Sequence, residues 1–194
     1  MSFLRQTDNG EEKGLRTVIT TEPTTEPIST TEFKAYAKID YTDDDTIIAE
    51  MIKAARKWSE EYIGRKIINT TVTAHWANYE RYMSLPFPPH ISITYVKTTS
   101  QGVATALTLD SDYYFIENYD YVLEMNSIYN TYGLQVQYVC GYSPTSANVP
   151  QSIRYAIMKI VANMYEHRND FVSASFSEVP FEAKALLQPF RIIF

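Results

Sequence analysis

The stretch DDDTIIAEMIKAARKWSEEYIG, residues 43–64, decides the fold of this chain because it reads as one complete amphipathic helix. Its apolar side chains recur at spacings of three and four, which places them on one helical face. They are Ile47, Met51, Ala55, Trp58 and Tyr62. Aspartates start the helix, where the positive end of its dipole favours anions, and Gly64 supplies a left-handed residue to end it. The pattern predicts a helix over 43–63 that packs by this face.

The aspartates Asp43, Asp44 and Asp45 allow two interpretations. Carboxylates are ligands of hard cations, so an acidic cluster can bind a metal ion. Consecutive residues at a helix start point in different directions, however, which favours capping and solvation. We therefore expect no metal site and no cofactor.

Composition indicates one domain with a hydrophobic core, because the chain has 194 residues and 45% of them are hydrophobic. The formal net charge of -6 argues against a surface that wraps nucleic acid, although DNA can pass through an acidic channel. Cys140 is the single cysteine, which excludes an internal disulfide. With no signal-peptide pattern and no apolar run of about 20 residues, we expect a soluble protein made in a reducing cytoplasm, without membrane contact.

The remaining segments predict an α+β fold. Residues 1–27 contain Thr-Glu-Pro twice and read as an extended arm, because proline disfavours helix. A short helix is expected over 29–38, capped by Ser29 or Thr30, and a second long helix over 150–169 that packs on the first. Short Thr- and Tyr-rich runs predict an antiparallel sheet. These runs are Ile67 to Trp76, Ile91 to Thr99, Tyr113 to Glu117, Tyr121 to Met125 and Leu134 to Tyr138.

The expected architecture is a helical core of two long helices plus shorter helices, with an inserted antiparallel β-sheet and extended N- and C-terminal arms. The chain divides into an N-terminal arm 1–27, a central domain 28–176 with its β region at 66–140, and a C-terminal helix and tail 177–194.

Catalytic motifs are absent from the sequence, which predicts a protein that is not an enzyme. Adjacent Glu166 and His167 could imitate an acid–base pair, but neighbouring helical side chains diverge by about 100 degrees. Cys140 could be a nucleophile if a histidine approached it, or else a small buried hydrophobic residue. The sixteen tyrosines suit carbohydrate or nucleotide stacking, or cross-strand pairs and interface surface.

Four segments, taken in this order, resemble the phage head-tail connector family, the small adaptor proteins that extend the portal of tailed phages. They are 27–36 followed by the acid cluster and 47–65, LPFPPHIS at 85–92, VQYVCGY at 136–142, and VP at 149–150 opening a helix that ends in MYEHR at 164–168. The likeness covers roughly residues 27–170, with a weaker echo in ALLQPFR at 185–191. The Thr-Glu-Pro arm and the apolar end at 192–194 depart from the family pattern.

The resemblance implies an assembly protein of the virion neck, put together in the host cytoplasm, without catalysis. It implies a dodecameric ring that docks on the portal protein, receives a stopper, tail-terminator or other tail component, and lines the DNA channel without sequence-specific binding. The competing hypothesis is a sheet-based ligand- or carbohydrate-binding module of a phage tail.

Two segments are candidate contacts. The C-terminal segment docks on the portal or an adjacent subunit, or else folds back on its own core; its candidate residues are Leu186, Leu187, Phe190, Arg191, Ile192 and Phe194. The loop from Tyr79 to His90 is stiffened by three prolines, and its candidate contact residues are Arg81, Phe87 and His90.

Overall fold

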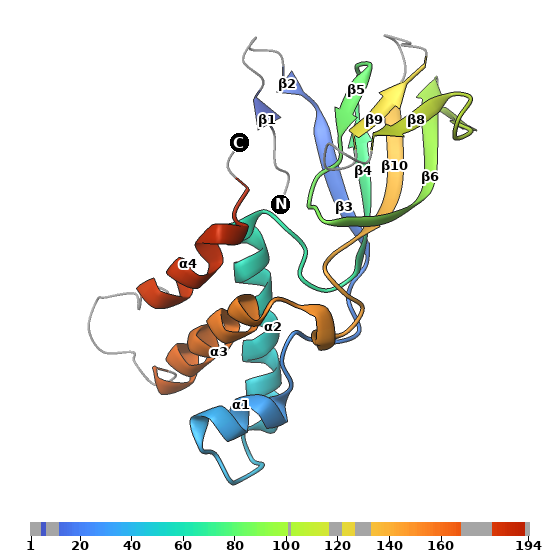
Figure 1. Cartoon of the computed structure of the whole chain (residues 1–194). Helices are drawn as coiled ribbons and strands as arrows, with labels where there is room; N and C mark the ends of the chain where they lie inside the picture. The colour runs from blue at the N-terminus through green and yellow to red at the C-terminus, as the bar shows by residue number, and fades with distance from the viewer. Residues whose placement is uncertain are drawn as a thin grey trace. The chain divides into compact units, whose positions relative to one another are not determined.

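The computed structural model describes residues 5–6, 12–100, 102–116, 122–126, 133–167 and 180–192 (Figure 1). The chain forms two compact units. The sheet unit comprises residues 1–22 and 69–141, and the helical unit comprises residues 23–68 and 142–194. The strands within residues 70–140 lie in sequence between two helices, whereas those within residues 5–21 precede the first helix, and the predicted α+β class is confirmed. The domain boundaries expected at residues 27 and 176 stay a prediction.

The helical unit contains four described α-helices, with α3 packed against both α2 and α4. They are α1 (Thr30–Ala37), α2 (Asp45–Ile63), α3 (Gln151–Glu166) and α4 (Phe181–Leu187), with 3-10 turns at Ser146–Asn148 and Gln188–Phe190. The predicted helices at 29–38, 43–63 and 150–169 are thus present with slightly shorter bounds, although residues 168–169 lie outside the described residues. The predicted packing of the two long helices is confirmed.

The buried face of α2 differs from the predicted one. Its fully buried apolar residues are Ile48, Ile52, Ala55 and Ile63. Ile47, predicted to face the core, is 44% exposed, and Met51, Trp58 and Tyr62 lie at the border of the core. Two adjacent apolar stripes run along this helix. The stripe that α1, α3 and α4 cover is displaced by one residue position from the stripe that the sequence pattern predicted.

Helix ends follow the local chemistry of the sequence. Ser29 and Glu32 form a reciprocal capping box at the start of α1, and Gly64 ends α2 with a φ of 71°. Asp44 is the N-cap residue of α2 but makes no side-chain cap; its Oδ2 accepts a hydrogen bond from the Tyr165 hydroxyl. Asp45 pairs with Lys34 of α1 at 2.7 Å. Two of the three aspartates therefore join α2 to neighbouring helices.

The sheet unit contains two larger sheets, where the sequence predicted one, and all their strand pairs are antiparallel. The five-stranded sheet has the order β3 (Leu15–Thr21), β4 (Thr70–Trp76), β10 (Gly133–Cys140), β6 (His90–Ser100) and β7 (Val103–Ala106). The three-stranded sheet has the order β5 (Tyr82–Ser84), β9 (Val122–Met125) and β8 (Tyr113–Ile116). Arg5–Gln6 (β1) pairs with Glu12–Lys13 (β2).

Strand β3 corrects one expectation for the N-terminal arm. Residues 15–21 were predicted as part of an extended arm, and they are extended, but they form an edge strand of the five-stranded sheet. Leu15 is buried there, whereas Val18 and Ile19 are exposed. The pairing requires partner residues fifty or more positions away, which local sequence does not indicate.

Alternation along β10 places its even-numbered residues inside the sheet unit. Leu134, Val136, Tyr138 and Cys140 are all buried, with half-buried residues between them. In the three-stranded sheet, Met83, Leu123 and Phe115 pair in register on the inward face. Successive side chains of a strand point to opposite faces, so the residues between these lie on the outward face.

Candidate functional site

No described part of the chain assembles a metal centre. Within the described ranges, no group of three or more His, Cys, Asp or Glu side chains could hold a metal ion, and no helix is long and apolar enough to cross a membrane. His167, half of the candidate acid–base pair, follows the C-terminal end of α3 with its Nδ1 2.9 Å from the Asn163 carbonyl oxygen. That ring is tied to the backbone of its own helix.

Cys140, the candidate nucleophile, lies opposite His90 in the β10–β6 register. The sequence hypothesis required a histidine near the thiol, and the register supplies one. Both side chains are buried, however. The Cys140 Sγ donates to the Thr70 carbonyl oxygen at 3.6 Å, and the His90 Nε2 lies 2.9 Å from the Pro86 carbonyl oxygen. A nucleophile must reach its substrate, so this arrangement supports packing rather than thiol chemistry.

The C-terminal segment folds back on the helical unit as far as residue 192. Arg65 Nε donates to the Phe190 carbonyl oxygen at 2.7 Å, and the Ile192 amide donates to the Ile63 carbonyl oxygen at 2.9 Å. The Arg191 guanidinium carbon lies 5.2 Å from the centre of the Tyr62 ring. These contacts hold the segment along the end of α2.

Burial separates the six C-terminal candidate residues. Leu187 is fully buried in the helical core, so it has no surface left for a partner and is withdrawn as a contact residue. Leu186, Phe190 and Ile192 are half-buried, and Arg191 is exposed. Phe194 lies outside the described residues. The four accessible residues remain available to an assembly contact that the Leu187 side chain cannot make.

The proline-rich loop is also largely internal. His90 is buried, and Phe87 has a left-handed backbone (φ 61°) with its side chain packed against the core of the sheet unit. His90 is therefore withdrawn as a contact residue. Arg81 alone among the three candidates is well exposed, with 62% of its side chain accessible. The sequence read this stretch as one loop, but residues 82–84 form β5.

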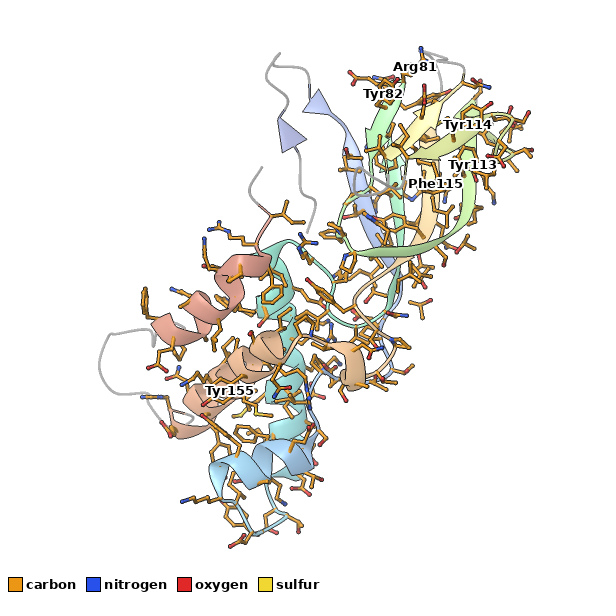
Figure 2. The ribbon with its side chains drawn as sticks, viewed as in Figure 1. Arg81, Tyr82, Tyr113, Tyr114, Phe115 and Tyr155 are labelled. Atoms are coloured by element: carbon orange, nitrogen blue, oxygen red, sulfur yellow. The ribbon has the colours of Figure 1, made fainter. Side chains whose placement is uncertain are left out.

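Arg81 belongs to an exposed cluster on the outward face of the three-stranded sheet (Figure 2). Tyr82 and Tyr114 both pair in register with Glu124, so the order across the sheet is tyrosine, glutamate, tyrosine. Arg81 Nε and Nη2 donate to Glu124 Oε1 at 3.1 and 2.8 Å, and the Tyr82 hydroxyl donates to the same oxygen at 3.2 Å. The Glu124 carboxylate, in turn, raises the pKa of Arg81.

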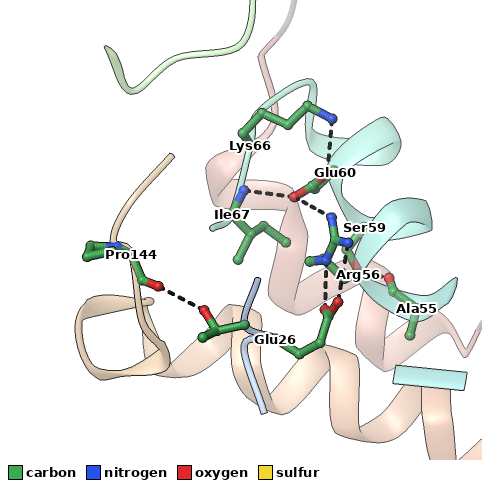
Figure 3. Close-up of polar contacts among 9 residues, drawn as sticks. Glu26, Ala55, Arg56, Ser59, Glu60, Lys66, Ile67 and Pro144 are labelled. Atoms are coloured by element: carbon green, nitrogen blue, oxygen red, sulfur yellow. Dashed lines mark hydrogen bonds and ion pairs between the residues drawn. The ribbon is translucent and has the colours of Figure 1, made fainter. Parts of the chain in front are cut away.

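A buried ionic network orders the segment that leads into α1 (Figure 3). Arg56 of α2 is 2% exposed and lies between Glu26 and Glu60, with its Nη1 3.3 Å from Glu60 Oε1. Lys66 Nζ contacts Glu60 Oε2 at 3.0 Å, and the Ile67 amide donates to Glu60 Oε1 at 3.1 Å. Each carboxylate thus meets more than one donor, which offsets the desolvation of the buried charges.

The helical unit carries an exposed aromatic pair of its own. Tyr36 of α1 and Tyr155 of α3 meet edge to face at 6.0 Å, and each is 40% exposed. The Lys159 ammonium lies 5.2 Å from the centre of the Tyr155 ring and pairs with Glu182 of α4. Because the pair is small and Tyr155 already contacts the Lys159 ammonium, we interpret it as a surface contact between helices.

Sequence reasoning missed the Arg56 network and the tyrosine row. Arg56 falls between Ile52 and Ser59 on the buried side of α2, so an arginine inside an apolar stripe was an available signal that a counter-charge must be buried with it. The row of Tyr82, Glu124 and Tyr114 left no such signal, because it depends on strand register.

Comparisons with known proteins give one family match and several solved structures of similar fold. The sequence model of the family described as head completion protein matches residues 26–189. Among curated proteins no match is found. A chain from the neck of an empty GTA particle, computed with C6 symmetry, is similar in fold, with a TM-score of 0.73 and 16% identity, covering 93% of this chain and 96% of that one.

Two further solved structures are similar in fold. One is a chain from the virion of a native gene transfer agent (GTA) particle, with a TM-score of 0.76 and 17% identity, covering 92% of this chain and 96% of that one. The other comes from the neck of a native GTA particle, computed with C12 symmetry, with a TM-score of 0.69 and 17% identity, covering 93% of this chain and 96% of that one.

Proposed function

Because the chain belongs to the head completion protein family, we propose that it is a structural, non-enzymatic protein of a phage neck, the junction of head and tail. The family match over residues 26–189 carries the proposal and confirms the predicted relation to phage head-tail connectors. The burial of Cys140 and the backbone contact of His167 support a role without catalysis. The protein is assembled in the host cytoplasm and resides in the virion neck.

Within that role the protein forms a ring, dodecameric as the sequence resemblance implies. It sits between the portal and the next neck component, a stopper, tail-terminator or other tail protein. Solved chains of similar fold come from neck structures computed with C6 and with C12 symmetry, which supports rotational assembly. The net charge of -6 suits a channel wall along which DNA passes, because such a surface does not neutralise phosphates.

The C-terminal segment is the proposed contact with the portal or an adjacent subunit. Arg191 is exposed at its end, and Leu186, Phe190 and Ile192 keep part of their apolar surface accessible. Phe194 completes the apolar end in the sequence. The Ile192 amide donates to the Ile63 carbonyl oxygen of α2, and the Arg65 side chain donates to the Phe190 carbonyl oxygen. The accessible side chains of the segment are therefore presented from a rigid support, at little entropic cost to binding.

Electron microscopy of the purified protein, alone and mixed with portal rings from the same source, tests the neck role. We expect symmetric density added at the narrow end of the portal. Intact portal rings with no added density, in the presence of folded protein, would contradict portal docking.

A second candidate function is a sheet-based carbohydrate-binding module of a phage tail, and the row of Tyr82, Glu124 and Tyr114 favours it. Aromatic side chains that flank a polar group can stack on sugar rings. Binding of oligosaccharides to the protein, lost on Tyr114→Ala, together with failure to join the portal, would favour this function over the neck role.

A further inference from the structure

We propose that the outward face of the three-stranded sheet binds a partner protein that inserts an arginine side chain between Tyr114 and Glu124. We call this face the tyrosine face; it comprises Tyr82, Ser84, Tyr114, Ile116, Val122 and Glu124. The inference rests on the proposed neck role and adds the chemistry by which one neighbour is recognised.

The tyrosine face exposes more aromatic surface than the stability of the sheet requires. The opposite face of the same strands already supplies its core, with Met83 and Leu123 buried. Tyr82 and Tyr114 are 53% and 40% exposed on the outward side. Tyrosine is enriched at protein interfaces because its ring contributes apolar contact area and its hydroxyl a hydrogen bond, at the expense of only two side-chain torsions.

The chain segment that supplies strands β8 and β9 of this face is acidic. From residue 98 to residue 153 the sequence has no lysine or arginine, and it contains Asp110, Asp112, Glu117, Asp120 and Glu124. Of these, Asp110 is exposed in the turn before β8, and Asp112 and Glu124 are half-buried. Complementary charge accelerates encounter and selects partners, so a basic surface is the expected complement.

Arg81 already shows how the face holds a guanidinium group. Its guanidinium carbon lies 5.7 Å from the centre of the Tyr82 ring while two of its nitrogens donate to Glu124 Oε1. Stacking on an aromatic ring combined with pairing to a carboxylate is the geometry that arginine favours over lysine. On the Tyr82 side of Glu124, the site for a guanidinium group is therefore occupied by the chain's own Arg81.

On the other side of Glu124, Tyr114 again places a tyrosine ring beside the carboxylate, but no arginine of the described residues lies there. Tyr114 is the direct cross-strand neighbour of Glu124, as Tyr82 is, so its side chain begins about 5 Å from that of Glu124. Among the described residues, no hydrogen bond or ring contact engages the Tyr114 side chain, and the side-chain hydrogen bonds of Glu124 all use Oε1. A partner arginine can stack on Tyr114 and donate to Oε2, which completes a symmetrical pair of guanidinium sites.

Photo-crosslinking in assembled particles tests this inference. The photocrosslinker p-benzoylphenylalanine replaces Tyr114 in one variant and Tyr155 in the control, which is also 40% exposed but lies on α3 of the helical unit. We expect position 114 to cross-link to another protein of the particle at a segment that contains arginine. Absence of the protein from particles would overturn the proposed function and this inference together. Incorporated protein whose position 114 gives no cross-link, or links to a second copy of this chain, would overturn this inference alone.

Affinity for the cross-linked partner then tests the chemistry. Tyr114→Ala and Glu124→Gln should each weaken binding about tenfold, because central tyrosines and paired charges dominate such interfaces. Tyr155→Ala should leave affinity unchanged. Equal affinity of wild type and Tyr114→Ala, or neutral oligosaccharides that bind the tyrosine face in saturation-transfer NMR, would overturn the arginine site.

Discussion

The guanidinium of Arg56 on α2 forms a two-pronged ion pair with the Glu26 carboxylate, with Nε 2.7 Å from Oε2 and Nη2 3.3 Å from Oε1. Arg56 is almost completely buried, whereas about a quarter of the Glu26 side chain is accessible. The pair fastens the extended residues before α1 to the middle of α2, thirty positions along the chain.

Glu26→Ala should lower the free energy of unfolding by about 2–4 kcal/mol, because Arg56 then keeps its buried charge with one carboxylate fewer. Urea denaturation followed by circular dichroism measures the change. Glu182→Ala is the matched control: it removes an exposed partner of Lys159, and we expect a much smaller loss, because solvent screens exposed ion pairs. Equal losses for the two variants would show that the Arg56 pair does not stabilise the fold specifically.

Glu32→Gln should reduce the loss of stability in acid. The Ser29 backbone amide and Arg154 hold the pKa of Glu32 below its ordinary value of 4.5. A lowered carboxylate pKa contributes stability above pH 4.5 that disappears as pH falls through the folded-state pKa. Thermal melts between pH 7 and pH 3 should therefore separate wild type from the variant fully above pH 4.5, and the two should converge as pH falls through the lowered pKa of Glu32. Glu50→Gln, on the exposed side of α2, is the control for the loss of one carboxylate. A difference in melting temperature between wild type and Glu32→Gln that stays constant from pH 7 to pH 3 would contradict the linkage.

Two variants of the C-terminal segment should separate folding from docking. Leu187→Ala removes a fully buried side chain and should cost about 2–5 kcal/mol of stability. Deletion of residues 193–194 leaves the contacts of Phe190 and Ile192 in place, so thermal stability should change little while portal docking is lost. Stability is read by thermal melts and docking by electron microscopy. If the variant without residues 193–194 still docks on the portal, residues other than these two make the contact.

Cys140 should react with a thiol reagent only when the sheet unit opens. Its side chain is fully buried on β10, and the thiolate must form and reach the reagent before reaction occurs. The labelling rate with an aromatic disulfide should be far below that of a small free thiol, and should rise with urea in parallel with unfolding. Native labelling faster than that of a free thiol would indicate an activated cysteine and reopen the enzymatic hypothesis.

Local sequence signals predicted the elements whose causes are local. The Ser29 capping box, the glycine that ends α2 and the proline before α3 each act within one turn, and each helix is present at nearly its predicted bounds. Strands with regular alternation, such as β4 and β10, were also recognised. Strands β3, β5 and β7 were missed, because a short or edge strand is defined by the partner that it pairs with.

The candidate contact residues show the same division. A proline-rich loop and an apolar terminus were recognised as unusual, but their residues differ in burial, which leaves Arg81 and Arg191 exposed and hides His90 and Leu187. Side-chain type did not distinguish the buried members from the accessible ones. Only packing against the two cores did.

The sequence by itself determined the α+β class, the long helices, most of the longer strands and the family, because periodicity, capping, turn residues and motif order are written along the chain. Only the tertiary structure decided which stripe of α2 is buried, that Glu26 meets Arg56, and that Tyr82 and Tyr114 flank Glu124. These outcomes depend on register and packing between segments far apart in sequence. Their energies arise from contacts that exist only after those segments have come together.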